Sequence, residues 1–223
     1  IFSSLNDIQK AVKGVVVMSD ELESLGDSLY YGKVPELWLF TSYPSLKPLA
    51  PYMTDLLARL AFMKKWLETE PPVVFWLSGL FFTTAFLTGA KQNFSRKYTI
   101  PIDAVSFDFE FIENTAQNTL EKPEDGAYCR GLYFDGARWD SEGKVLAQPE
   151  PKVLFSQAPI IWMKPMKIQD ISEYKHYNCP VYKTSERWGI LATTGHSTNF
   201  VMYIRIPSNQ EEKTWILAGI ALL

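Results

Sequence analysis

The residues with the greatest capacity for chemistry lie in the second half of the chain. His176-x-x-Cys179 has the spacing of two zinc ligands, and Cys129 and His196 offer two more donors that could complete a tetrahedral set. This spacing recurs nowhere else, whereas a structural zinc site usually shows paired clusters. We therefore predict no metal site, and we expect Cys179 to act as a small buried apolar residue.

The stretch Gly195-His196-Ser197-Thr198 places a possible base beside possible nucleophiles. It lacks the G-x-S-x-G pattern that exposes a catalytic serine, and adjacent residues of a strand point to opposite faces. We interpret it as a turn in which Gly195 takes a positive φ and the hydroxyls bind local backbone groups.

Phosphate-binding and acid–base patterns are also missing from the sequence. Gly89-Ala90-Lys91-Gln92 lacks the leading glycine and the Ser or Thr of a P-loop, and no G-x-G-x-x-G is present. Three carboxylates lie in a Pro- and Gly-containing loop, where solvated charges are usual: Glu121, Glu124 and Asp125. We predict no cofactor and no active site in this segment.

Composition narrows the possible partners. The 22 basic and 25 acidic residues give a formal charge of −3, which argues against nucleic acid as a partner. The uncharged run from Val73 to Ala90 is interrupted by Ser, Thr and Gly and follows Pro71-Pro72, so we expect a buried core segment and no membrane span. The two cysteines fit a reducing intracellular setting. A start at Ile1 and an end within an apolar run suggest a piece of a longer protein.

The first half of the sequence reads as helical. Apolar residues at helical spacing predict one helix over 3–31, which Gly32 stops. Its apolar stripe docks either on its own domain or on a neighbouring one, and the sequence leaves both open. Four prolines make 35–51 an extended connection. Further helices are predicted from Pro51 to Glu68 and from Thr83 to Tyr98.

The hydrophobic period changes at residue 104. Apolar and polar residues alternate over 105–111, as in a half-buried strand, and Asp135-Gly136 predicts a hairpin joining 128–134 to 137–139. Short β-branched or aromatic runs predict more strands: 160–163, 180–182, 188–193, 200–206 and 214–222. We predict an α+β fold, with a helical subdomain at 1–103 and an antiparallel sandwich or partial barrel at 104–223.

Several long stretches carry a specific resemblance. They are SYPSLKPL at 42–49, WLSGLFFTTAFLTG at 76–89, QNFSRKYTIPID at 92–103, EKPEDGAYCRGLYFDGARWD at 121–140, CPVYKTSERWGILATTGHSTNFV at 179–201 and WILAGIALL at 215–223. In this order, over nearly the whole sequence, they resemble the C-terminal region of dynein heavy chains, and of axonemal ones in particular. The departures are mild: Leu80, Thr84, Phe94-Ser95 and Ala218 replace residues more usual in the family.

The resemblance implies a definite architecture and role. The parent would be an ATP-driven, minus-end-directed microtubule motor with a ring of six AAA+ modules, located in the cytoplasm and the cytoskeleton of a ciliary or flagellar axoneme. This segment would follow the sixth module and lie across one face of the ring, helices first and an incomplete β-barrel last. It would brace the ring and tune ATP turnover and force output, with ATP and Mg²⁺ bound elsewhere in the parent. Its partners would be the AAA+ modules of its own heavy chain, while the parent binds microtubules and other dynein chains. Whether the segment slows or assists the motor stays open.

The candidate residues fall into two groups. Ring contacts are predicted from the apolar stripe and the charges beside it: Asp20, Glu21, Leu22, Glu23, Leu25 and Leu29. Structural motifs are predicted at Trp76 and Gly79, which with Phe81 would form the core between the halves, at Gly136, Arg138 and Trp139 in the hairpin, and at Gly195 and His196 in the turn.

Two other functional classes remain as alternatives. A free-standing β-barrel module would bind peptide, sugar or single-stranded nucleic acid on its aromatic strands. A metal-dependent enzyme would be built around His176, Cys179 and His196.

Overall fold

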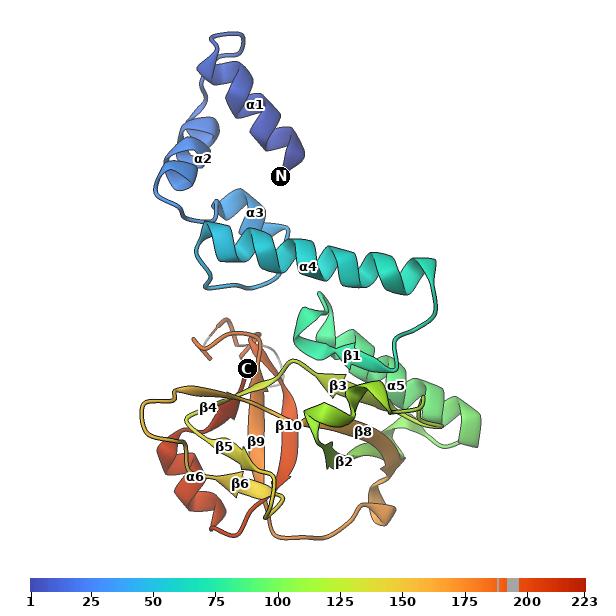
Figure 1. Cartoon of the computed structure of the whole chain (residues 1–223). Coiled ribbons are helices and arrows are strands. Elements are labelled where there is room, and N and C mark those ends of the chain that lie inside the picture. The colour runs from blue at the N-terminus through green and yellow to red at the C-terminus, as the bar shows by residue number, and fades with distance from the viewer. Residues whose placement is uncertain (188, 192–196) are drawn as a thin grey trace. The chain divides into compact units, whose positions relative to one another are not determined.

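The computed structural model describes residues 1–187, 189–191 and 197–223 (Figure 1). By packing, the protein divides into two compact units, Ile1–Glu68 and Thr69–Leu223, called unit 1 and unit 2 below. The predicted subdomains, 1–103 and 104–223, follow the change in hydrophobic period instead, and their boundary stays a prediction.

Unit 1 is helical. Its helices are α1 (Phe2–Val12), α2 (Asp20–Tyr30), α3 (Glu36–Phe40) and α4 (Leu49–Glu68). The α4 helix confirms the helix predicted from Pro51 to Glu68. Pro51 is tolerated there because it lies in the first turn, where a proline removes no helical hydrogen bond. The predicted extended connection is partly wrong, since α3 forms within it directly after Pro35.

The prediction of one helix over 3–31 is wrong. The α1 helix ends at Val12, and Gly14, whose φ is +72°, caps it: the amides of Gly14 and Val15 donate to the carbonyls of Ala11 and Lys10. This pattern is a Schellman cap. The α2 helix then begins afresh, because the Ser19 hydroxyl accepts a hydrogen bond from the Leu22 amide at 3.3 Å. Apolar periodicity continues across the break, which is why the sequence suggested a single helix.

A polar cluster around Asp55 fastens the connection before α4 to the helix itself. The two oxygens of Asp55 accept hydrogen bonds from Lys47 Nζ and Arg59 Nε, each at 2.7 Å. The Arg59 guanidinium also lies 3.8 Å from the centre of the Tyr43 ring. Burial alone would raise the pKa of Asp55, but the hydrogen bonds from Lys47, Arg59 and Tyr43 outweigh it and lower that pKa from 3.8 to about 2.

Unit 2 contains two sheets, a short hairpin and two α-helices within the described residues. In spatial order, sheet A comprises β1 (Val74–Trp76), β3 (Ala127–Arg130), β8 (Ile160–Lys167) and β2 (Val105–Ile112). Sheet B comprises β10 (Phe200–Pro207), β9 (His176–Tyr182), β11 (Ala221–Leu222), β4 (Tyr133–Asp135) and β7 (Phe155–Gln157). The hairpin is β5 (Arg138–Asp140) with β6 (Val145–Ala147), and the helices are α5 (Thr83–Tyr98) and α6 (Glu212–Ala218).

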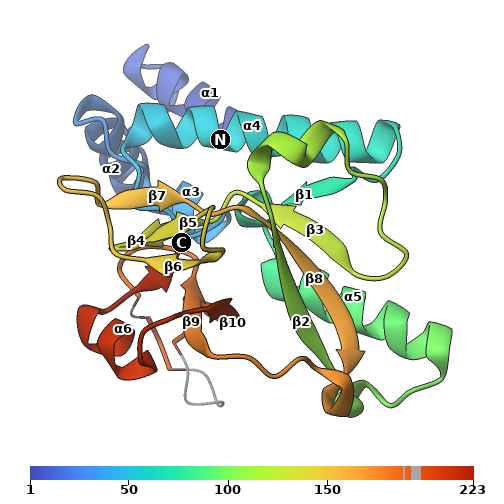
Figure 2. The ribbon, with the colours of Figure 1, turned by 60° about the horizontal axis from the view of Figure 1, so that its bottom comes forward.

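The predicted fold class is confirmed. Helices come first in the sequence, mostly antiparallel strands follow, and the described strands do not close into a complete barrel. Two pairings are parallel, β1 with β3 and β11 with β9. Figure 2 shows α5 lying along β8 and β2 of sheet A. The β2 strand confirms the predicted alternation, with Val105 and Phe107 buried.

The hairpin predicted at Asp135-Gly136 is wrong. The β4 strand pairs with β11 and β7, while β5 pairs with β6, so the turn leads out of sheet B instead of folding the backbone back on itself. Gly136 does have a positive φ of +78°, which the turn requires. Asp-Gly specifies this local backbone, but it does not specify which strands pair.

The strand predicted over 214–222 is also wrong in its first part. These residues form α6, a sharp end at Gly219 with φ of +68°, and then the short β11. The indole of Trp215 is fully buried and donates a hydrogen bond to Ser208 Oγ at 2.7 Å. Burial of this one large side chain favours the helix over the strand that the β-branched residues suggested.

Trp76 is packed against backbone that has no side chain. A Cβ built on Gly79 would lie 2.3 Å from the Trp76 ring, and one built on Gly131 would lie 2.4 Å from it. The Trp76 indole donates to Ser78 Oγ at 2.9 Å, and Ser78 donates in turn to the Gly131 carbonyl at 2.6 Å. This cluster holds β1 beside β3. It thereby joins residues 76–79, which precede residue 103, to Gly131, which follows it.

An ion pair links the two sheets. Arg205 of β10 in sheet B donates to Asp108 of β2 in sheet A at 2.6 Å, and both side chains are largely buried. Arg205 also donates to the Ser172 carbonyl at 2.9 Å, and the Ser172 hydroxyl donates to Asp108 at 3.0 Å. Fully buried side chains from both sheets, including Ile160, Ile161, Ile204 and Ile206, form the core.

The Trp76 packing predicts the effect of two matched substitutions. Gly79→Ala should destabilise the protein by about 1–3 kcal/mol, because the new methyl overlaps the indole. Gly89→Ala is the control. It lies inside α5, where a new Cβ meets no described atom within 4 Å, and it should stabilise by about 0.5–1 kcal/mol. Urea unfolding measures both values, and equal midpoints for the two variants would contradict the assigned packing.

The Asp55 cluster predicts a pH-dependent stability. Because the folded pKa is lowered, the stabilisation by Asp55 is complete above the unfolded pKa near 3.8 and is lost as pH falls towards about 2. Wild type should exceed Asp55→Asn by about 2 kcal/mol near neutral pH, and the difference should shrink between about pH 4 and about pH 2. The control is Asp7→Asn, since the contacts of Asp7 are exposed: an ion pair with Lys10 at 3.8 Å and a hydrogen bond from Ser3 Oγ at 3.3 Å. A difference that does not change with pH would refute the assigned role of Asp55.

Candidate functional site

The predicted zinc-like pair does not come together. His176 and Cys179 are three residues apart in β9, so their side chains point to opposite faces of sheet B. Cys179 and Cys129 are fully buried in different sheets, and burial raises the pKa of both thiols. Among the described residues, no group of three His, Cys, Asp or Glu side chains is placed to hold a metal ion. The fourth candidate donor, His196, lies outside the described residues, as does Gly195.

The acidic loop has a structural role. Lys97 donates to Glu124 at 3.1 Å and to Asp125 at 3.0 Å, and the Tyr98 hydroxyl donates to Asp125 at 2.7 Å. These bonds tie the end of α5 to the loop before β3. The carboxylates therefore serve as anchors for a helix end and are not paired with each other as an acid–base dyad.

The residues predicted to contact a ring lie on α2, with mixed exposure. Asp20, Glu21 and Glu23 are exposed in the first turn, where negative charges favour the helix dipole. Leu22 and Leu29 are half-buried, whereas Leu25 is buried within the molecule and offers no free surface. Since α1 and α2 contact each other, part of the stripe is used inside unit 1.

Arg138 and Trp139, which were predicted to belong to a hairpin at Asp135-Gly136, lie instead in the β5–β6 hairpin. The Trp139 ring stacks on Phe111 with centroids 4.8 Å apart, and Arg138 pairs with Asp140 at 3.8 Å. Both belong to the β5–β6 hairpin, and both help to line a small cavity of about 230 Å³ that also includes Glu150 and Gln157.

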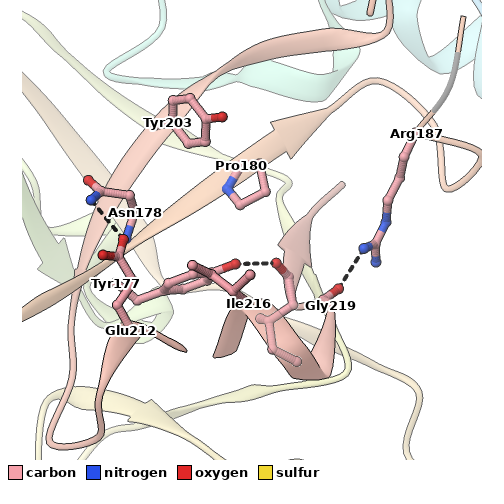
Figure 3. Close-up of a pocket in the computed structure, with 9 residues that line it drawn as sticks. Tyr177, Asn178, Pro180, Arg187, Tyr203, Glu212, Ile216 and Gly219 are labelled. Atoms are coloured by element: carbon pink, nitrogen blue, oxygen red, sulfur yellow. Dashed lines mark hydrogen bonds between the residues drawn. The ribbon is translucent and has the colours of Figure 1, made fainter. Parts of the chain in front are cut away.

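A larger pocket of about 600 Å³ lies between α6 and the β9–β10 pair (Figure 3). Its lining residues are Tyr177, Asn178, Pro180, Arg187, Tyr203, Glu212, Ile216, Gly219 and Ile220. Its size falls within the range of about 300–1,000 Å³ that is usual for ligand pockets. The sequence did not indicate this pocket. Glu212 and Ile216 are four residues apart, which places both on one side of the α6 helix, but the sequence pattern predicted a strand over 214–222.

Hydrogen bonds fix the walls of this pocket. The Tyr177 hydroxyl donates to the Ile220 carbonyl at 2.7 Å, and the Asn178 amide and side chain donate to Glu212 Oε1 at 3.2 and 2.9 Å. Arg187 donates to the Gly219 carbonyl at 2.5 Å and forms an ion pair with Asp135. Burial raises the pKa of the Tyr177 hydroxyl, so that group stays a donor. The arrangement can bind, but it presents no nucleophile beside a base.

Comparison with known proteins identifies the family. The family model for the C-terminal domain of dynein heavy chains matches residues 1–223, so this protein segment belongs to that family.

Among the described residues, no helix has the length and apolarity that a membrane span needs.

The particular relatives are axonemal, as the resemblance predicted. The sequence is 55% identical to dynein axonemal heavy chain 12 of Homo sapiens over 223 residues, which is 100% of the segment and 7% of that protein. It is 52% identical to dynein axonemal heavy chain 3 of Mus musculus over 222 residues, 99% of the segment and 5% of that protein. It is 49% identical to dynein axonemal heavy chain 1 of Mus musculus over 223 residues, again 5% of that protein. The segment thus spans only a small part of the relatives that it matches.

The pocket walls predict a stability effect that can be measured. Tyr177→Phe removes the donor to the Ile220 carbonyl and leaves a buried acceptor unpaired, which should cost about 1–2 kcal/mol. Tyr133→Phe is the matched control, since the Tyr133 side chain is exposed and should tolerate the change within about 0.5 kcal/mol. Thermal and urea unfolding provide the comparison. Equal stability of the two variants would show that the hydroxyl does not hold β11 to β9.

Proposed function

We propose that this segment is a non-catalytic brace of an axonemal dynein heavy chain. It docks on the AAA+ modules of its own heavy chain and modulates their ATP turnover and force output during microtubule-based ciliary movement. It resides in the axoneme, within the cytoskeleton of a cilium or flagellum. ATP and Mg²⁺ bind elsewhere in the heavy chain, which also makes the contacts with microtubules and other dynein chains.

The observation that carries this proposal is the exposed apolar surface of unit 1 in a protein that matches a dynein C-terminal domain throughout. Phe40 is 91% exposed, Leu67 87% and Phe2 82%. Other apolar side chains of unit 1 are also exposed: Val12, Val15, Val17, Tyr30, Tyr31, Leu37, Leu57 and Leu60. So many exposed apolar side chains in so small a unit are typical of a surface that another protein covers.

The charges of α2 suggest how that surface is oriented. Asp20, Glu21 and Glu23 form an exposed acidic edge on the first turn of α2, and they remain our candidates for contact with basic groups on a ring module. Leu22 and Leu29 contribute their exposed parts. Leu25 acts indirectly, because its burial holds α2 in place.

The chemistry within the segment supports a non-catalytic role. The thiols of Cys129 and Cys179 are buried, and Glu124 and Asp125 are bound to Lys97. Gly89 and Lys91 lie inside α5, where the backbone amides are used by the helix and do not face a phosphate.

The test uses a heavy-chain motor truncated just before this segment. We expect a saturable change in its ATPase rate when the 223-residue protein is added, and no hydrolysis by the added protein alone. The double variant Phe40→Ser/Leu67→Ser should need about tenfold more protein for half of the effect, because it removes two exposed apolar contacts. Leu154→Ser, the same kind of change at an exposed leucine of unit 2, is the control and should behave as wild type.

Two results would count against the brace. One is an unchanged ATPase rate both with added protein and with a version in which the segment is fused to the motor. The other is a double variant that acts like the Leu154→Ser control, since docking through unit 1 would then be wrong.

A further inference from the structure

We infer that the pocket between α6 and the β9–β10 pair receives an arginine side chain presented by another protein. The residues that carry this inference are Pro180, Tyr203, Glu212 and Ile216. It does not rest on the proposed brace, whose evidence lies in unit 1.

The walls of the pocket are apolar and open to solvent. Pro180 of β9 and Tyr203 of β10 are cross-strand partners, so their side chains lie together on one face of sheet B. Ile216 of α6 also lines the cavity, as Figure 3 shows. Tyr203 is 47% exposed and Ile216 60% exposed, so both present surface that a partner could cover. These walls suit the aliphatic stem of a long side chain.

A carboxylate stands at one end of this apolar space. Glu212 Oε1 accepts two hydrogen bonds from Asn178, which fixes the orientation of the carboxylate. Within the described part of the molecule, no ion pair joins Glu212 to a lysine or arginine. Its Oε2 therefore remains for a cationic donor.

The cation of the pocket lining is already engaged. Arg187 lies at the opposite end from Glu212 in Figure 3, with its guanidinium directed at the Gly219 carbonyl. Its charge is matched by Asp135. The pocket is therefore polarised, with an unmatched negative charge at the Glu212 end and a neutralised pair at the other.

Arginine fits this arrangement better than the alternatives do. Its planar guanidinium can direct two N–H groups at Glu212 Oε2, while its aliphatic stem lies along the apolar walls. Lysine offers a single point charge and would fill less of a cavity of about 600 Å³. A wholly apolar side chain would cover the carboxylate without pairing it, which carries a desolvation cost.

The test titrates the 223-residue protein with the peptide acetyl-Ala-Arg-Ala-amide while the δ1-methyl groups of isoleucine are observed by NMR. We expect saturable shifts at Ile216 and Ile220, with a dissociation constant on the order of 1 mM for a single side chain. The same peptide with citrulline, which keeps the shape of arginine but has no charge, should bind about fivefold more weakly or not at all.

A pair of variants separates the pocket from general charge. Glu212→Gln keeps an oxygen for Asn178 but removes the negative charge, and it should weaken arginine-peptide binding about fivefold. Glu211→Gln removes the same charge one residue earlier, outside the pocket lining, and should leave binding unchanged.

Several outcomes would overturn the inference. They are the absence of shifts at Ile216 and Ile220, equal binding of the citrulline peptide, and equal effects of the two glutamine variants. Methyl shifts that change on dilution without peptide would show that a second copy of the protein fills the pocket instead. None of these results bears on the ATPase test, so the two proposals can fail separately.

Discussion

Unit 2 depends on the ion pair between Asp108 and Arg205. The described strands of the two sheets do not pair with one another into a closed barrel, so side chains must hold the sheets together. Asp108 belongs to the edge strand of sheet A and Arg205 to the edge strand of sheet B. Ser172, in the connection between them, hydrogen bonds to both. Burying such a pair costs desolvation free energy, and removing one partner costs more because it leaves an unpaired buried charge. The pair therefore fixes which edge strands of the two sheets meet.

The sequence predicted the helices of this fold better than its strand pairing. Periodicity located α4, the cations at the C-terminal end of α5 marked that helix, and alternation located β2, because these signals are local. The errors arose at glycines and at pairings: Gly14 divides the first helix, Gly219 ends α6, and the Asp135-Gly136 turn leads out of a sheet. A turn dipeptide constrains two residues, whereas pairing is decided by distant strands. The pocket escaped notice for the same reason, since it needs α6 to be recognised as a helix.

The two units differ in where they place their apolar side chains. Unit 1 exposes many apolar side chains and contains a polar cluster at Asp55, a combination that suits a surface held in shape for a large partner. Unit 2 buries apolar side chains from both of its sheets in a core and forms the pocket between α6 and the β9–β10 pair. The family match fixes the context, the C-terminal domain of an axonemal dynein heavy chain.

The position of β11 has a consequence for how the domain is made. Leu222 pairs with Val181 of β9 on one side and with Phe134 of β4 on the other, so the central strand of sheet B is supplied by residues that follow all its other strands. A polypeptide emerging from a ribosome would hold two unjoined half-sheets with bare edges until those residues appear. A message that stopped just before Ala221 would leave the sheet in that state. Protein made from such a message should therefore be recognised as misfolded and removed by the cell's quality control.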